Sequence, residues 1–390
     1  MERTLIPIFE RIFGMPPEVS SFAPGRINII GEHTDYNLGY VLPAALNLRN
    51  YFFLSRRPDD QVSIWAENFK KKEEFPLTEI SFSEDNQWVN YIKGILWVLE
   101  EKGFKFQGIN GLIWGNVPLE AGLSSSAALE VSVVHGLDTL FELGIEPLEK
   151  VKIARKAENE FVGVQCGIMD QFISVFGQES MVLFLDCETL DYKLFPLRMI
   201  DAGLRIVVYE TGVRRELASS EYNRRRNESA QALEVLRKSG VQKYKEATLG
   251  KLEGMKNDMN DVVFRRARHV ISENQRVRDA VLALEKDDFI RLGELISQSH
   301  ESLRDDYEVS CPELDLLYKV AQEFPGCLGA RLTGAGFGGS GIALVKIEGI
   351  AAFKEKLLDD AEKEGFPRPT FYEVEVGGGT QAYFLSEEKG

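Results

Sequence analysis

A serine-rich loop in front of a helix constrains this chain more than any other stretch of its sequence. Residues 117–128 contain a glycine followed by three serines, and an apolar segment over residues 109–114 precedes them. Apolar residues then recur at helical spacing over residues 127–141. The pattern predicts a strand, a loop and a helix in succession, with the loop at the helix N-terminus.

The start of that helix is a favourable place for an anion. The first backbone N–H groups of a helix have no partner within it, and the helix dipole places partial positive charge there. The hydroxyl groups of Ser124, Ser125 and Ser126 add donors, or a ligand for a metal ion that accompanies a phosphate. Capping of the helix by serine is the simpler interpretation, but it needs one serine and not three. We therefore expect a phosphate-binding loop here.

The composition excludes several classes of partner. The net charge of −15 disfavours nucleic acid and anionic membranes, because a duplex binder needs a basic face. The cysteines show no CxxC spacing and the histidines form no HxxxH set, so neither a disulfide framework nor a structural zinc site is indicated. No apolar run approaches the roughly 18 residues of a membrane span, and the N-terminus lacks the apolar core of a secretory signal. We expect a cytoplasmic protein without a membrane or nucleic-acid partner.

The length of 390 residues favours two domains or more, at roughly 150 residues per domain. The hydrophobic pattern thins near residue 200 before a new strand begins, which predicts an N-terminal domain over residues 1–200 and a C-terminal domain over residues 201–390. Segments of helical pattern in the second domain lie at residues 216–237, 267–285, 288–303, 313–323 and 351–364.

A glycine-rich stretch lies at residues 330–345. Gly334, Gly336 and Gly339 fit the GxGxxG fingerprint of dinucleotide-binding folds by letter. That fingerprint leads into a helix, whereas an apolar strand follows here, so a dinucleotide site is not indicated. Glycine lets the backbone come close to other groups. We expect a hairpin whose turn approaches a ligand or the other domain.

A cluster of charged residues lies between glycines near the N-terminus. Residues 21–43 contain Arg26, Glu32, His33 and Asp35, with apolar flanks that are typical of strands. Asp35, Asn37 and Gly39 are ordinary turn formers, but a turn does not explain why Arg26, Glu32 and His33 lie here together. The carboxylates at positions 32 and 35 are spaced to converge on the hydroxyls of one sugar. A glycosidase acid/base pair is an alternative, although it has no use for a phosphate loop.

Two further residues have an open role on local grounds. Asp170 lies near the start of a short predicted helix, where an aspartate is typical of a helix N-cap. Tyr222 lies beside a cluster of arginines at the start of the helix predicted over residues 216–237. Such a basic cluster is usually a solvated face, but the tyrosine needs another reason.

These segments together resemble the galactokinases, a family of the GHMP small-molecule kinases. Residues 24–37 are similar to the galactokinase signature, residues 122–128 to the phosphate loop of the superfamily, and residues 332–339 to its third motif. Residues 166–174 and 221–225 are also similar to galactokinase segments. The resemblance covers nearly the whole chain. It implies an α/β fold of the α+β type, with two domains that meet at the active-site cleft.

The resemblance implies transfer of the ATP γ-phosphate to the anomeric C1 hydroxyl of D-galactose, which gives galactose 1-phosphate and ADP. It implies that Asp170 takes the proton from that hydroxyl and that Arg26 stabilises charge on the transferring phosphoryl group. It also implies that Ser126 and Glu158 hold Mg2+, an ion that prefers oxygen ligands. The implied sugar contacts are Glu32, His33, Thr34, Asp35, Gly167 and Tyr222. The implied ATP phosphate contacts are Glu120, Ala121, Gly122, Leu123, Ser124, Ser125 and Ser126.

Glu120 departs from the family pattern, which usually has glycine at this position of the loop. A carboxylate near phosphates is repulsive unless it points to solvent or pairs with a cation. We therefore expect Glu120 to face away from the nucleotide.

The same motifs leave two alternatives. A GHMP kinase for a related sugar, such as galacturonate, arabinose or N-acetylgalactosamine, would keep the loops and change the sugar contacts. A non-catalytic paralogue would bind galactose and ATP as a sensor. Such paralogues tend to lose part of the serine-alanine loop, whereas residues 124–128 and Asp170 are all present here. The partners implied are small molecules only, with no obligate protein partner.

Overall fold

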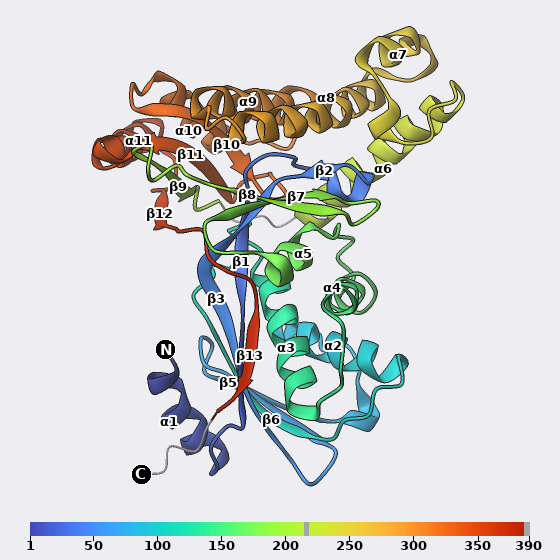
Figure 1. Cartoon of the computed structure of the whole chain (residues 1–390), viewed down its shortest axis with the longest axis vertical. Coiled ribbons are helices and arrows are strands. Elements are labelled where there is room, and N and C mark those ends of the chain that lie inside the picture. Colours follow the sequence, from blue (N-terminus) through green and yellow to red (C-terminus); the bar gives the residue numbers. More distant parts are fainter. Residues whose placement is uncertain (120, 214–217, 386–390) are drawn as a thin grey trace.

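The strand expected before the serine loop is β6 (Ile109–Gly115), which lies inside a six-stranded sheet (Figure 1). The computed structural model describes residues 1–119, 121–213 and 218–385. The sheet has the order β13-β1-β3-β6-β4-β5, in which β4 and β6 run parallel and the other neighbours run antiparallel. Its other strands are β1 (Val19–Asn28), β3 (Pro43–Arg56), β4 (Gln61–Ala66), β5 (Lys71–Pro76) and β13 (Gln381–Phe384).

Alternate residues of β3 face opposite sides of this sheet, as the pleat requires. Phe52 and Leu54 join the core that the sheet shares with its covering helices, whereas Phe53 packs with Leu5 and Phe9 on the other side. Those two residues belong to α1 (Glu2–Phe13). The covering helices are α2 (Asn90–Glu101), α3 (Ser125–Phe141), α4 (Pro147–Lys156), the π-helical turn η4 (Ala157–Val162) and α5 (Met169–Phe176).

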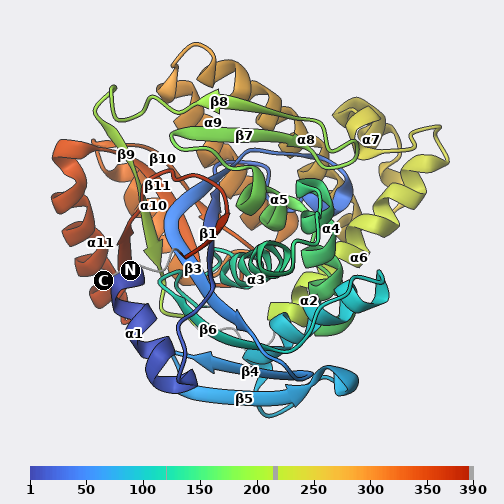
Figure 2. The same cartoon turned by 60° about the horizontal axis from the view of Figure 1, so that its bottom comes forward.

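The second half of the chain builds a four-stranded sheet beside a layer of helices (Figure 2). The sheet has the order β10-β11-β9-β12 and is antiparallel throughout. Its strands are β9 (Leu204–Glu210), β10 (Cys327–Thr333), β11 (Ser340–Lys346) and β12 (Thr370–Glu373). The helices are α6 (Ala218–Arg237), α7 (Leu249–Gly254), α8 (Asp261–Leu284), α9 (Phe289–Ser302), the π-helical turn η7 (Leu303–Tyr307), α10 (Pro312–Glu323) and α11 (Ile350–Glu364).

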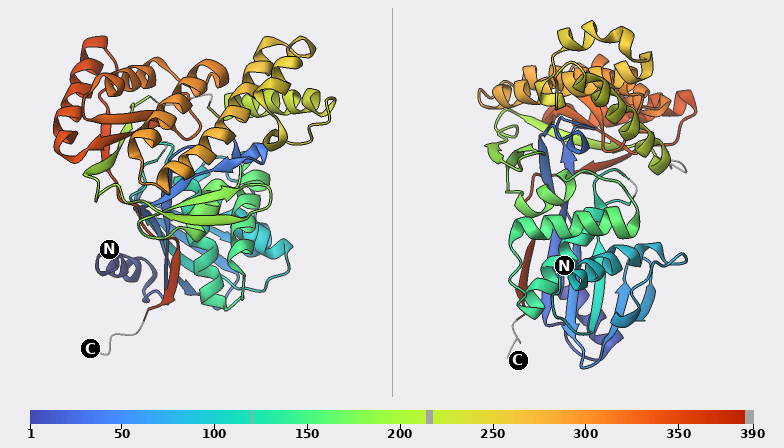
Figure 3. Two further views of the ribbon diagram at one scale, coloured as in Figure 1. Left: turned by 45° about the horizontal axis from the view of Figure 1, so that its top comes forward. Right: turned by 90° about the vertical axis from the view of Figure 1, so that its right-hand side faces the viewer.

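The two halves share one hydrophobic core. Ile27 and Leu42 from the first half belong to the same buried cluster as Val208, Leu292 and Ile342 from the second. A small sheet of β2 (Tyr40–Val41), β7 (Met181–Asp186) and β8 (Tyr192–Pro196) lies at this junction, where α8 packs against β2. Figure 3 shows the helices of the second half at one end of the molecule and the six-stranded sheet at the other. The halves are therefore packed on each other and not merely tethered.

Most of the expected elements are present. The helices predicted at residues 216–237, 267–285, 288–303 and 313–323 are α6, α8, α9 and α10. The last strand does not stay with the second half, because β13 pairs with β1 in the first sheet. Among the described helices, none combines the length and the apolar character needed to cross a bilayer.

Candidate active site

The serine loop opens onto a cleft of about 680 Å³ that both halves of the chain line. The first half contributes Arg26 and the loop that leads into α3, and the second half contributes Tyr222, Gly334 and Ala335. The cleft therefore lies at the domain junction, where the resemblance placed it.

The serine at the start of α3 does not cap the helix through its side chain. Ser124 occupies the N-cap position, but its backbone is left-handed with φ 61° and its side chain makes no capping hydrogen bond. Its hydroxyl instead donates to the Asp170 carboxylate. The Ser124 side chain therefore does not use the first N–H groups of α3. These groups can donate to an anion, which this end of a helix favours. The capping interpretation is wrong for Ser124.

The glycine-rich turn between β10 and β11 supports the serine loop from behind. Gly122 and Gly334 both have positive φ, at 75° and 85°. A Cβ atom on Gly334 would lie 2.9 Å from the carbonyl oxygen of Gly122, which is closer than side chains normally come. Only glycine allows the two backbones to pack this closely. The expectation that the turn approaches the other domain is confirmed.

An ion pair joins the sugar signature to the motif around residue 170. Arg26 donates through Nε to Asp170 Oδ1 at 2.8 Å and through Nη2 to Asp170 Oδ2 at 2.7 Å. Its Nη1 also donates to the Gly122 carbonyl oxygen at 2.5 Å. The pairing of β1 with β3 is irregular between Pro24 and Arg26. Such an irregularity changes the direction in which a strand side chain points, which here is that of Arg26. Three motifs that are distant in sequence thereby meet at one carboxylate.

The N-cap alternative for Asp170 is wrong. The N-cap of α5 is Ile168, and Asp170 lies in the first turn with its carboxylate turned towards Arg26 and Ser124. A quarter of the Asp170 side chain is exposed to the cleft, against 7% of the Arg26 side chain. Burial alone lowers the pKa of Arg26, but the nearby Asp170 and Glu32 carboxylates raise it above its ordinary value. Arg26 is therefore a permanent cation at the base of the cleft.

The two residues implied as magnesium ligands lie side by side. Ser126 Oγ donates to Glu158 Oε1 at 2.9 Å, and the other carboxylate oxygen accepts from Gln171 Nε2 at 2.6 Å. Burial raises the pKa of Glu158. Within the described residues, no group of three or more His, Cys, Asp or Glu side chains forms a metal site. The pair suits Mg2+, which takes one or two protein oxygens and completes its shell with phosphate and water.

Aromatic and acidic side chains enclose the other end of the cleft. The His33 ring centroid lies 5.7 Å from that of Tyr222, and the Tyr36 centroid lies 5.3 Å from that of Tyr222. Asp35 lies beside Gly167, where any Cβ atom would overlap the Asp35 carboxylate. Burial and the charge of Asp170 raise the pKa of Asp35 to about 6. Rings, carboxylates and an imidazole are the groups that recognise a sugar.

The remaining expected sugar contacts have different surroundings. Glu32 lines the cleft, but its carboxylate also accepts from Asn28 Nδ2 and the Gly334 backbone N–H, and it pairs with Arg331 at 3.0 Å. Thr34 is fully buried, and its hydroxyl lies 2.7 Å from two carbonyl oxygens of its own loop. Glu32 is thus held firmly at the wall of the cleft, whereas Thr34 braces the loop from within.

The residues expected to contact ATP phosphates fall into those that line the cleft and those that do not. Gly122, Leu123 and the three serines line the cleft, whereas Ala121 is fully buried in the core beneath the loop. Glu120 lies outside the described residues, so its orientation stays a prediction.

Local patterns missed one wall of the cleft. Phe69, Trp88 and Trp114 line it beyond the serine loop, together with Tyr91. The Phe69 side chain is 42% exposed, and its ring centroid lies 6.4 Å from that of Trp88. Trp88, Trp114 and Tyr91 are half-buried. Aromatic rings that line a cleft favour a flat ligand. These residues belong to no motif, and only the fold brings them together.

The geometry combines the parts of a phosphoryl-transfer site. An anion site at a helix start, a buried cation, a carboxylate and a pair of oxygen ligands all face one cleft. Phosphoryl transfer needs alignment and charge neutralisation more than covalent participation of the protein.

Known protein families match three segments of the chain. The GHMP kinases N terminal domain matches residues 90–178, and the GHMP kinases C terminal domain matches residues 280–361. The galactokinase galactose-binding signature matches residues 8–56, which include His33 and Asp35.

Curated relatives are similar to this chain over nearly its whole length. The galactokinase of Staphylococcus carnosus is 43% identical over 382 residues, which cover 96% of this chain and 97% of the relative. The galactokinase of Thermotoga maritima is 44% identical over 359 residues, which cover 92% of this chain and 98% of the relative.

Solved structures agree with these relatives. Lactococcus lactis galactokinase, crystallised in complex with galactose, matches with a TM-score of 0.93 and 39% identity over 97% of this chain and 99% of that chain. The mevalonate kinase of Methanococcus jannaschii shares the fold at a TM-score of 0.63 and 18% identity, over 92% of this chain and 98% of that chain.

Proposed function

The chain belongs to the galactokinase family of the GHMP kinases, and from that membership we propose how its cleft performs the reaction. It is an ATP-dependent sugar kinase that transfers the γ-phosphate of ATP to the C1 hydroxyl of D-galactose. The products are galactose 1-phosphate and ADP. The observation that carries the mechanism is the Arg26–Asp170 pair, which lies where the sugar loop and the serine loop meet.

Galactose occupies the end of the cleft that holds Asp35, His33 and Tyr222. Asp35 accepts hydrogen bonds from sugar hydroxyls, and the close approach of Gly167 leaves its carboxylate facing the ring. The aromatic side chains cover the apolar face of the sugar. This arrangement points the C1 hydroxyl towards Asp170.

ATP lies across the serine loop. Its phosphates accept hydrogen bonds from the N–H groups at the start of α3, where the helix dipole favours negative charge, and from the Ser125 hydroxyl. The hydroxyls of Ser124 and Ser126 already donate to Asp170 and Glu158. The adenine ring stacks in the aromatic wall formed by Phe69, Trp88 and Trp114. The γ-phosphate is then directed towards the sugar.

Asp170 acts as the general base. Its carboxylate accepts the proton of the C1 hydroxyl as the oxygen attacks the γ-phosphate, which is the role that kinase aspartates serve. Arg26 and Ser124 orient this carboxylate, and Arg26 offsets the negative charge that spreads over the transferring phosphoryl group.

Ser126 and Glu158 would hold Mg2+, because two adjacent oxygen donors at the phosphate site fit this ion. When bound, Mg2+ neutralises charge on the phosphates of ATP. Gln171 keeps the Glu158 carboxylate oriented towards Ser126. The cytoplasmic location and the outward orientation of Glu120 stay predictions, which cell fractionation and a Glu120→Gly variant would test.

The test of substrate identity is ADP release by the purified protein with Mg-ATP and a panel of sugars. The panel contains galactose, glucose, galacturonate, arabinose and N-acetylgalactosamine. We expect galactose to give the highest kcat/KM, because the sugar loop carries the whole galactokinase signature. A higher kcat/KM on galacturonate, arabinose or N-acetylgalactosamine would identify that sugar as the substrate instead. Galactose binding without turnover on any sugar would support the sensor alternative.

A further inference from the structure

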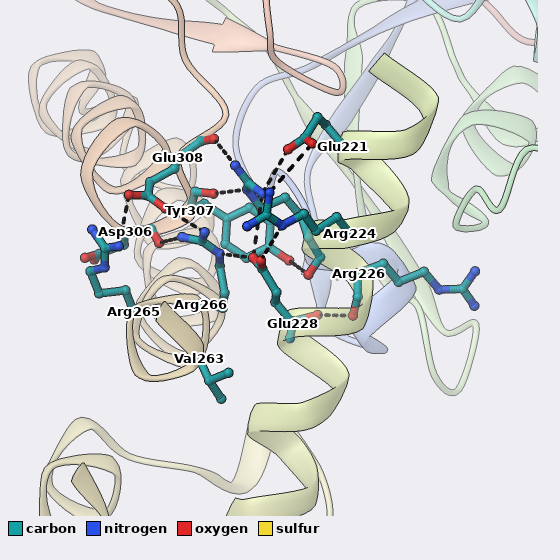
Figure 4. Close-up of polar contacts among 12 residues, drawn as sticks. Glu221, Arg224, Arg226, Glu228, Val263, Arg265, Arg266, Asp306, Tyr307 and Glu308 are labelled. Atoms are coloured by element: carbon teal, nitrogen blue, oxygen red, sulfur yellow. Dashed lines mark hydrogen bonds and ion pairs between the residues drawn. The ribbon is translucent and has the colours of Figure 1, made fainter. Parts of the chain in front are cut away.

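Two buried arginines outside the cleft hold the end of η7 through its carbonyl groups (Figure 4). Arg225 of α6 is 7% exposed and Arg266 of α8 is 1% exposed. Arg225 donates through Nε to Tyr307 O at 2.8 Å and through Nη2 to Glu308 O at 2.9 Å. Arg266 donates through Nη1 to Asp306 O at 2.5 Å. The last carbonyls of a helix lack partners within it, so the two arginines satisfy the end of η7.

Carboxylates from neighbouring elements balance these two charges. Arg266 Nε lies 2.7 Å from Glu228 Oε2, and its Nη2 lies 2.6 Å from Glu308 Oε2. Arg225 lies 3.3 Å from Glu221 and 3.7 Å from Glu228. Buried cations persist in proteins when they are paired, and the planar guanidinium can serve carboxylates and carbonyls together. We call Arg225, Arg266, Glu228 and Glu308 the arginine cluster; it fixes α6, α8 and η7 relative to one another.

The segment that the arginine cluster holds carries Tyr307, which contacts the sugar loop. Tyr307 is fully buried, and its ring centroid lies 4.8 Å from that of His33. Its hydroxyl lies 2.9 Å from the Tyr36 hydroxyl, which lies 2.7 Å from His33 Nδ1. His33 also has an unusual backbone φ of 61°, a conformation that surrounding contacts must support. The position of Tyr307 therefore sets the orientation of His33.

The arginine cluster also places the second sugar-facing aromatic residue. Tyr222 lies one turn before Arg225 in α6, so the contacts of Arg225 fix the register of Tyr222 over the cleft. Tyr222, His33 and Tyr36 are all among the residues that line the cleft, whereas Tyr307 is not. The side chains that face the sugar from both halves are thus held by groups that do not reach it.

We propose that Tyr307 is a positioning residue for galactose, which acts through Tyr36 and His33 and is itself held by the arginine cluster. The proposal rests on the function proposed above. The ATP phosphates belong at the start of α3, which neither Tyr307 nor Tyr36 contacts through a hydrogen bond recorded in the described residues. Loss of the Tyr307 hydroxyl therefore weakens galactose binding and leaves ATP binding unchanged.

The test is Tyr307→Phe, which removes one hydroxyl and keeps the ring. We expect the KM for galactose, and the Kd for galactose measured by calorimetry without ATP, to rise about fivefold to twentyfold, the scale of one hydroxyl lost from a buried hydrogen-bond network. The KM for ATP should stay within about twofold. Tyr318→Phe is the matched control, because Tyr318 is also buried and loses a 3.1 Å bond to Glu301 away from the cleft. It should change thermal stability and neither KM.

A double variant separates positioning from general loosening. Tyr36→Phe removes the other hydroxyl of the pair, so the galactose Kd of the double variant with Tyr307→Phe should be close to that of Tyr36→Phe alone. Unchanged galactose affinity in Tyr307→Phe would overturn the proposal, and so would multiplicative effects in the double variant or an equal rise in the KM for ATP.

Two further outcomes are also decisive. If Tyr307→Phe does not fold, Arg225→Lys is tested in its place, because lysine keeps the charge but cannot make the paired hydrogen bonds of the guanidinium to η7. The galactose Kd of Arg225→Lys should also rise. An unchanged Kd would overturn the proposal. A native protein that neither binds nor phosphorylates galactose would contradict the proposed function itself, and the positioning role with it.

Discussion

Asp35 and Asp170 are neighbouring carboxylates whose surroundings give them different roles. Asp170 is held by Arg26 and Ser124, whereas no buried cation is paired with Asp35 among the ion pairs of the described residues. Burial and the charge of Asp170 raise the pKa of Asp35 to about 6. The ionisation of Asp35, the carboxylate proposed to bind the sugar, therefore changes near pH 6.

This pKa predicts a pH dependence of galactose binding. Above about pH 6 Asp35 is ionised and accepts hydrogen bonds from sugar hydroxyls, whereas below pH 6 it is protonated and loses acceptor capacity. The KM for galactose should be constant above about pH 7 and should rise towards tenfold per pH unit well below pH 6. The KM for ATP, measured over the same range, separates this effect from general acid damage.

Asp35→Asn is the control for that profile. Asparagine keeps an acceptor oxygen but cannot ionise, so its KM for galactose should be higher at neutral pH and nearly flat between pH 5 and 8. A flat profile for the native protein over the same range would contradict the assignment of Asp35 to the sugar.

Single functional residues could be predicted from the sequence where they belong to motifs, whereas residues that act from outside the motifs could not. Arg26, Asp170, Ser126 and Glu158 could be named because the family resemblance carries them over one by one. Tyr307 could not, because it lies 271 residues from Tyr36 in a segment without a motif. Thr34 belongs to a motif, but whether a hydroxyl faces the ligand or its own loop is decided by the folded backbone.

At the scale of elements, the turn between β10 and β11 acts as a support for the serine loop. A Gly334→Ala change would place a Cβ atom 2.9 Å from Gly122 O and would also strain a backbone at φ 85°. The serine loop would have to shift, and small displacements of positioned groups cost large factors in rate. We expect kcat/KM for ATP to fall about tenfold or more in steady-state assays.

Gly365→Ala is the matched control for that variant. Gly365 also has a positive φ, of 72°, but no heavy atom lies within 4 Å of its Cβ position. The change should cost about 1 kcal/mol of stability through backbone strain and leave kcat/KM unchanged. Equal losses of activity in both variants would show that strain alone, and not contact with Gly122, explains the effect.

The regular helices were predictable because their apolar residues recur at a constant period, as in α8 and α9. The π-helical turns η4 and η7 were not, because an extra residue in a turn leaves no clear mark in the hydrophobic pattern. Both turns carry a residue with a proposed role, because Glu158 lies in η4 and Tyr307 lies in η7. The hairpin of β7 and β8 was also missed, because its short strands lie between the motifs, in a segment for which no strand was predicted.

At the scale of the whole molecule, the cleft exists because two halves share one core. Ile27 and Val208 belong to the same buried cluster, and β13 carries the end of the chain back to β1. The order β13-β1-β3-β6-β4-β5 pairs strands that are far apart in sequence, which local patterns cannot specify. The family resemblance predicted two domains around a cleft, but only the folded chain shows that Gly334 packs against the serine loop there.

The proposed role of Asp170 as the base that activates galactose can be measured directly. The measurement is the single-turnover rate of galactose 1-phosphate formation by Asp170→Asn and by the native protein, with galactose Kd determined by calorimetry on both. We expect the rate to fall about a hundredfold or more in Asp170→Asn, the usual scale for removal of a general base, and the galactose Kd to stay within about threefold of the native value. A near-native rate in Asp170→Asn would contradict it.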